Sequence, residues 1–165
     1  MWGWSIADRD LDYLGIDLDG VDYWLWDAFP TRPRVVICEF NPLFGRDAAV
    51  TIPYRADFSR KARGDDGRRA YPRGYHGASI GAYAALARRK GYRLVGSVPR
   101  GTNVYFVRND IEADGLPEVS PQEAWRPIMK GKEPIPRKTE LYEEINRDDV
   151  RRHFAELGFP LVQVD

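Results

Sequence analysis

The sequence has 165 residues with 25 basic and 25 acidic side chains, so its formal net charge is zero. A hydrophobic fraction of 43% is that of a globular protein, and the length suits one compact domain. Zero net charge argues against a dedicated nucleic-acid binder, and no apolar run approaches the length of a membrane span. The single cysteine, Cys38, cannot form an intramolecular disulfide, so we expect a reduced, cytoplasmic setting.

The first half of the chain predicts a strand, a helix and a second strand. Residues 12–17 are apolar with little alternation, as in a strand covered on both faces. Residues 21–29, "VDYWLWDAF", place Val21, Trp24, Leu25 and Ala28 at helical spacing. Residues 33–41, "PRVVICEFN", are β-branched and continuous, which favours a strand. This order predicts an α/β protein with a Rossmann-like, mostly parallel sheet.

The rest of the chain predicts one long loop, a helix, a hairpin and a final helix. Residues 42–77 are rich in Gly, Pro, Arg and Asp and read as an irregular loop. Residues 78–92 read as an alanine-rich helix that Gly77, Ala78 or Ser79 caps and Gly91 ends. Strands at 92–98 and 103–110 are expected to form an antiparallel hairpin. We therefore expect an α/β unit over 1–110, followed by a proline-rich segment and a helix over 139–158, with Thr139 as cap, in 111–165.

Polar side chains follow both strands of the first unit, where ligands bind in open α/β sheets. Asp17 and Asp19 end the first strand, and Glu39 and Asn41 end the second. Carboxylate and amide oxygens suit hard cations such as Mg²⁺, Mn²⁺ or Ca²⁺, so these four residues are predicted metal ligands. Alternatively, a carboxylate there could act as a general base or hold a substrate hydroxyl or amine, which makes Asp17 and Asp19 candidate catalytic residues.

Each of these residues also has a purely structural interpretation. Asp19 could cap the following helix, and Asp17 could accept a hydrogen bond from loop backbone. His76, just before the alanine-rich helix, is a candidate for proton transfer or for contact with a bound anion, or is a surface loop residue. The arginines of residues 59–77 could bind phosphate, but their interspersed aspartates favour a solvated loop.

The run "LDYLGIDLDGVDYWLWDAF…PRVVICEFNPLFG" resembles the region of the fourth and fifth strands in class I SAM-dependent methyltransferases, most closely the FkbM type. The likeness continues through "GASIGAYAALARRKGYRLVG" and "TNVYFVRND", which resemble the last helix and the terminal β-hairpin. The resemblance implies a partial class I methyltransferase sheet with a C-terminal hairpin. It also implies O-methyl transfer from SAM to a small molecule or a saccharide.

The resemblance also bears on the site and on partners. Some metal-dependent O-methyltransferases hold a divalent ion on acidic and amide groups at these strand ends, where Asp17 or Asp19, Glu39 and Asn41 stand here, Glu39 in place of an Asp. The family's glycine-rich SAM-binding turn has no counterpart in this sequence, so we expect the C-terminal half of such an enzyme, stabilised as a homo-oligomer or by a partner chain. Two alternatives stay open: a non-catalytic oligomerising or partner-binding module, and a metal-dependent glycosyltransferase-like protein that uses "DLD".

Overall fold

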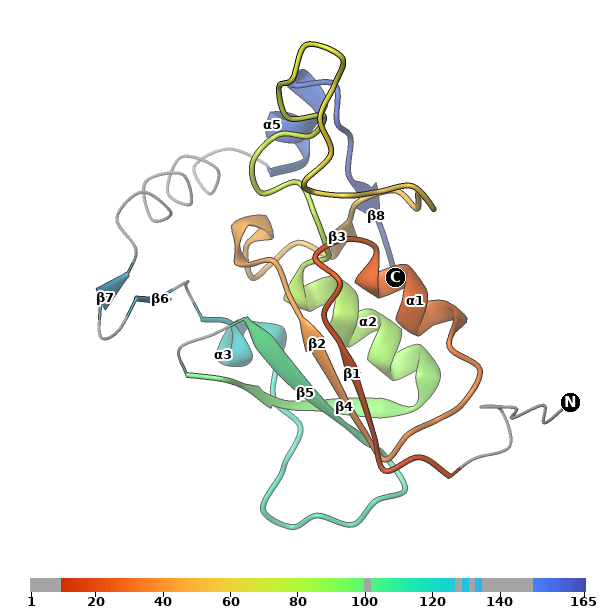
Figure 1. Cartoon of the computed structure of the whole chain (residues 1–165). Coiled ribbons are helices and arrows are strands. Elements are labelled where there is room, and N and C mark those ends of the chain that lie inside the picture. Colours follow the sequence, from red (N-terminus) through yellow and green to blue (C-terminus); the bar gives the residue numbers. More distant parts are fainter. Residues whose placement is uncertain (1–9, 100–101, 127–128, 131–132, 135–149) are drawn as a thin grey trace, which may run out of the picture.

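A four-stranded sheet backed by two helices forms the centre of the computed structural model, which describes residues 10–99, 102–126, 129–130, 133–134 and 150–165. The strand order is β1-β2-β5-β4; in the view of Figure 1, α2 lies behind β1 and β2, and α1 lies to the right of these strands. The central elements are β1 (Tyr13–Ile16), α1 (Asp22–Ala28), β2 (Val35–Glu39), α2 (Ile80–Lys90), β4 (Tyr92–Ser97) and β5 (Asn103–Arg108). The shorter elements are η2 (Pro42–Phe44), β3 (Val50–Thr51), α3 (Pro121–Ala124), β6 (Met129–Lys130), β7 (Glu133–Pro134), α5 (Val150–Glu156) and β8 (Val162–Gln163).

The central sheet is mixed, so the prediction of a mostly parallel Rossmann-like sheet is wrong. Only β1 and β2 are parallel, with Ile16 opposite Cys38. The predicted hairpin of β4 and β5 does form, but β5 inserts between β2 and β4 and is antiparallel to both. The single parallel pair therefore comes from the one strand–helix–strand crossover, because a hairpin strand must run against its neighbour.

Local sequence signals account for the confirmed elements. Helix α2 begins where the Ser79 side chain accepts a hydrogen bond from the backbone of Ala82, and Gly91 ends it in a left-handed conformation. Helix α1 forms where it was predicted, but its buried residues include Tyr23 and Trp26, whereas Leu25 is exposed. The spacing therefore predicted the helix correctly without revealing which side faces the sheet.

Two hydrophobic clusters hold the described residues together. The sheet core lies between the sheet and its helices, and Trp26 is fully buried there against Tyr83, Tyr92 and Phe106. The loop core joins the loop of residues 42–77 to the C-terminal segment; its buried members are Leu43, Phe44, Val50, Ile52, Tyr75, Val150 and Phe154. The sheet core follows the predicted helices and strands, whereas the loop core joins segments far apart in the sequence.

The C-terminal segment gives order to the loop that the sequence predicts to be irregular. Strand β8 pairs antiparallel with β3, and the Tyr75 hydroxyl donates to the backbone carbonyl of Pro160 at 2.8 Å. Helix α5 confirms the C-terminal part of the predicted final helix, and the predicted Thr139 cap lies outside the described residues. Among the described helices, none combines the length and apolar character that crossing a membrane requires.

Candidate metal centre

The loop between β1 and α1, "DLDG", is shaped by a buried aspartate that follows it. The Asp22 carboxylate is 2% exposed and accepts hydrogen bonds from the backbone N–H groups of Leu18 and Gly20, at 2.7 and 2.9 Å. Asp19 takes a left-handed φ of 55°, a conformation that aspartate tolerates better than most residues. The helix N-cap is Val21, without a side-chain cap bond, so the interpretation of Asp19 as a helix cap is wrong.

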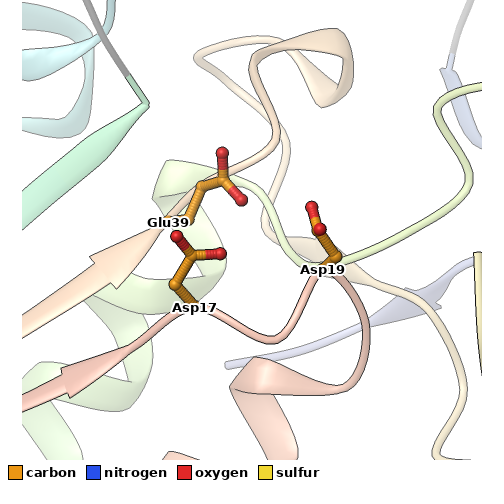
Figure 2. A group of neighbouring side chains, drawn as sticks. All are labelled: Asp17, Asp19 and Glu39. Carbon is orange, nitrogen blue, oxygen red and sulfur yellow. The ribbon is translucent and has the colours of Figure 1, made fainter.

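Three carboxylates meet at the ends of the parallel strands. Ile16 of β1 lies opposite Cys38 of β2, so the residues that follow, Asp17 and Glu39, are neighbours across the strand ends. Figure 2 shows these two side chains together with Asp19 from the loop. Each offers one carboxylate oxygen, and these three oxygens lie within 4.8 Å of one another. The structure therefore brings together three of the four metal ligands that the sequence predicts.

The carboxylates differ in their surroundings. Asp17 is exposed, and its carboxylate accepts no hydrogen bond from any residue that the structure describes. The alternative interpretation of Asp17, in which it accepts a hydrogen bond from loop backbone, is thus not met among the described residues. Glu39 is partly buried, and its Oε1 accepts a hydrogen bond from the Thr102 hydroxyl at 2.7 Å. Thr102 therefore fixes the orientation of Glu39, while Asp17 remains available to a ligand.

The site favours a proton or a cation at Glu39. Burial is the main reason why the pKa of Glu39 is raised above its usual range, and the bond from Thr102 opposes that shift. The negative charges of Asp17, Asp19 and Asp22 raise the pKa of Glu39 further. The same negative charges favour a bound cation, because they attract it. This attraction is stronger where water is partly excluded.

An arginine from the long loop already contributes a positive charge. The Arg60 guanidinium lies 2.6 Å from the Asp19 carboxylate. The same loop contacts the "DLDG" turn twice more: Phe58 lies beside Gly20, and the Gly77 N–H donates to the Gly20 carbonyl at 2.8 Å. A Cβ atom on Gly20 would come within 3.0 Å of the Phe58 ring, so this glycine permits the close approach. Sequence reasoning missed Arg60, which is one of several arginines in its loop.

Asn41 and His76 lie in the neighbouring loops and have different contacts. The Asn41 side chain is buried; its nitrogen donates to the carbonyls of Gly74 and His76, and its oxygen accepts from the Leu43 backbone. Through these bonds the Asn41 side chain holds the loop, so it is less available to a cation than the three carboxylates are. His76 is next to Gly77, which bonds to the turn, but it is not part of the three-carboxylate group.

Other arginines of the loop are paired with nearby aspartates. Arg55 pairs with Asp57 at 3.0 Å, and Arg68 with Asp66 at 3.7 Å. These exposed pairs agree with the interpretation of a solvated loop. Arg60 differs from them because its partner belongs to the acidic group, about 40 residues earlier in the sequence.

The donor set fits a hard divalent cation. Three carboxylates on two adjacent strand ends supply oxygen ligands, which Mg²⁺, Mn²⁺ and Ca²⁺ prefer over nitrogen or sulfur. Comparison with known proteins found no matching family model, no similar curated protein and no similar solved structure.

Proposed function

We propose that the chain binds a divalent cation through Asp17, Asp19 and Glu39, and that this site orients a substrate hydroxyl for methyl transfer from SAM. The observation that carries the proposal is the convergence of three carboxylate oxygens within 4.8 Å, at the carboxyl ends of parallel strands, where α/β proteins bind ligands. The methyl-transfer part rests on the resemblance to FkbM-type enzymes, with a small molecule or a saccharide as substrate.

Each residue has a distinct part in the proposed reaction. A bound cation would act as a Lewis acid and lower the pKa of a hydroxyl held beside it. Glu39, oriented by Thr102, provides a fixed ligand. Asp17 has no hydrogen-bond partner among the described residues, so one of its oxygens can bind the cation while the other accepts the hydroxyl proton or holds the hydroxyl in place. Because Asp19 is paired with Arg60, cation binding requires this ion pair to open or to be shared.

A thermal-unfolding experiment tests the cation site. At about 100 times its Kd, a cation that binds only the folded chain should raise the Tm by roughly 5–10 °C. Mg²⁺, Mn²⁺ and Ca²⁺ are compared on the wild type, on Asp17→Asn, and on Asp47→Asn as a control. Asp47 is an exposed aspartate outside the three-carboxylate group, paired with Arg46 at 3.7 Å. The Asp17 variant should lose most of the rise and the Asp47 variant should keep it; no rise in the wild type would reject the site.

A second series separates the possible reactions. SAM and S-adenosylhomocysteine are titrated into the chain with and without Mn²⁺, and UDP-sugars are titrated in parallel. A Tm rise with SAM supports the methyltransferase. A rise with UDP-sugars that requires Mn²⁺ would support the glycosyltransferase-like alternative instead, because such enzymes hold the nucleotide through a divalent ion. A Tm rise with the cation but with neither SAM nor UDP-sugars would support the cation site and reject methyl transfer by this chain.

A further inference from the structure

The two edge strands of the central sheet, β4 and β1, differ in how far neighbouring segments cover them. At the β4 edge, the Val119 N–H donates to the Leu94 carbonyl at 2.9 Å, and a register shift interrupts the strand between Leu94 and Gly96. The Arg93 guanidinium also donates to the carbonyl of Arg108, at the end of β5, and to those of Ile111 and Leu116 in the segment that follows. A neighbouring segment and a bulge thus close this edge, as natural sheets commonly do.

The β1 edge has no such cover among the described residues. The Val35 N–H donates to the Asp12 carbonyl, and parallel strands alternate, so Leu14 bonds toward β2 while Tyr13 and Gly15 direct their backbone groups outward. No described residue bonds those outward groups. The strand, "YLGI", contains no charge, proline or bulge, and the Tyr13 side chain is 69% exposed. An edge of this kind is a template for another strand.

We propose that β1 pairs with β1 of a second copy of this chain, antiparallel about a twofold axis centred on Leu14. In this register Tyr13 lies opposite the partner's Gly15, and both carry outward backbone groups. The two equivalent pairs together make four backbone hydrogen bonds, because residues opposed in this way exchange both N–H···O bonds. The proposal depends only on the described sheet edge and is independent of the proposed cation site.

The side chains of β1 are complementary to themselves in this register. Tyr13 and Gly15 lie on the sheet face away from the helices, and the exposed Tyr13 ring would cover a glycine that has no side chain of its own. Leu14, on the helix side, is only partly buried against the sheet core and would meet the partner's Leu14. A twofold register centred on Gly15 would instead place Tyr13 opposite Asp17, beyond the end of the strand. A second copy therefore fits the edge with apolar contacts and no opposed charges.

Sedimentation of the full chain over about 5 to 200 µM tests the pairing, since a dimer of micromolar affinity dissociates across this range. The wild-type mass should rise from 18.9 kDa toward twice that value. Gly15→Pro removes an outward N–H from each copy, and Tyr13→Lys places two like charges near the axis. Each should weaken dimerisation by about tenfold or more. Leu116→Lys, at a 45% exposed leucine beside the opposite edge, should not change it. Circular dichroism and Tm confirm that the variants fold.

A crosslink tests the register directly. Leu14 would oppose its equivalent as a non-hydrogen-bonded pair, with Cα atoms about 4.5 Å apart, within reach of a disulfide. Leu14→Cys should form a covalent dimer under mild oxidation. Leu25→Cys on α1 should not, and the native Cys38 is fully buried and should not react. A monomer at all concentrations would overturn the proposal, and so would a dimer that Leu14→Cys fails to crosslink.

Discussion

The sheet core and the loop core reach similar burial by different routes. Trp26 and Phe106 of the sheet core belong to a helix and a strand whose own sequence patterns predict them. Phe44 and Phe154 of the loop core lie edge to face at 5.8 Å, although more than 100 residues separate them. Regular elements are thus visible in the local sequence, whereas a loop can be ordered by a distant segment that leaves no local trace.

The comparison matters for the site because each core supplies one part of it. The sheet core fixes the ends of β1 and β2, and with them Asp17 and Glu39. The loop core holds the segment that brings Phe58 against Gly20 and Arg60 against Asp19. The carboxylate ligands are thus positioned by the sheet core, whose elements the sequence predicts. The positive charge of Arg60 is positioned by the loop core, which the sequence does not predict.

Loss of the sheet core should have the largest effect. Trp26→Ala removes a fully buried ring that packs against three aromatic side chains, and we expect it to lower the free energy of unfolding by about 5 kcal/mol. Urea unfolding followed by circular dichroism measures the change. Trp26→Phe should cost less, since it keeps an aromatic ring and the indole N–H has no partner among the described residues. Equal costs would show that the aromatic packing is not what stabilises this core.

Loss of a loop-core side chain should have a smaller effect, confined to the loop and the C-terminal segment. Phe154→Ala removes a buried ring from α5, at an expected cost of about 3 kcal/mol to the opening of this region. Native-state hydrogen exchange should show faster exchange at two amides: that of Ile52, which bonds to Gly77 within the loop, and that of Val164, which bonds from the C-terminal segment to Ala49 of the loop. The Phe106 amide in β5 should keep its protection. Equal loss at both places would show that the two cores unfold as one unit.

The strand–helix–strand unit, the alanine-rich helix and the hairpin could be predicted because each has a local cause. Ser79 and Gly91 bound α2 by capping, and the β-branched run around Val36 forms β2. Strand order was not predictable in this way. Nothing in residues 103–108 indicates that β5 pairs with β2, which is why the sheet was expected to be mostly parallel. The pairing of β3 with β8 was missed for the same reason.

The candidate site, like the fold, was predictable only in the part that local sequence determines. The rule that ligands gather at strand ends led to Asp17, Asp19 and Glu39, which the structure brings together. It also pointed to Asn41, which holds the loop instead. Arg60 could not be chosen from the sequence, because only long-range packing decides which arginine of the loop reaches Asp19.

Removing the positive charge of Arg60, which the loop core holds beside Asp19, should strengthen cation binding. Arg60→Gln frees the Asp19 carboxylate, so a cation no longer competes with the guanidinium, and its affinity should rise by up to about fivefold, as expected for a partly exposed ion pair. Titration of Mn²⁺ measures the change. Arg68→Gln, which breaks the Asp66 pair in the same loop, serves as the control and should change nothing. A weaker affinity in the Arg60 variant would mean that Arg60 supports the site.

The smallest expected effect is a pH dependence at Glu39. Because its pKa is raised in the folded state, the folded chain holds the proton more tightly than the unfolded chain does. Ionised Glu39 therefore costs stability above its folded-state pKa, and this cost disappears below the ordinary Glu pKa. Without a cation, Glu39→Gln should raise the urea midpoint at neutral pH and have little effect below about pH 4. A midpoint lower than that of the wild type at neutral pH would contradict the sign.

Isothermal titration of Mn²⁺ into the full chain at neutral pH measures whether Asp17, Asp19 and Glu39 bind a cation. We expect one cation per chain, a loss of at least about tenfold in affinity in Glu39→Gln, and unchanged binding in Asp47→Asn. The affinity of the wild type should also fall as the pH is lowered through the raised pKa of Glu39, because the protonated carboxyl cannot serve as a ligand. No heat of binding in the wild type, or equal binding in Glu39→Gln, would contradict a metal centre at the ends of β1 and β2.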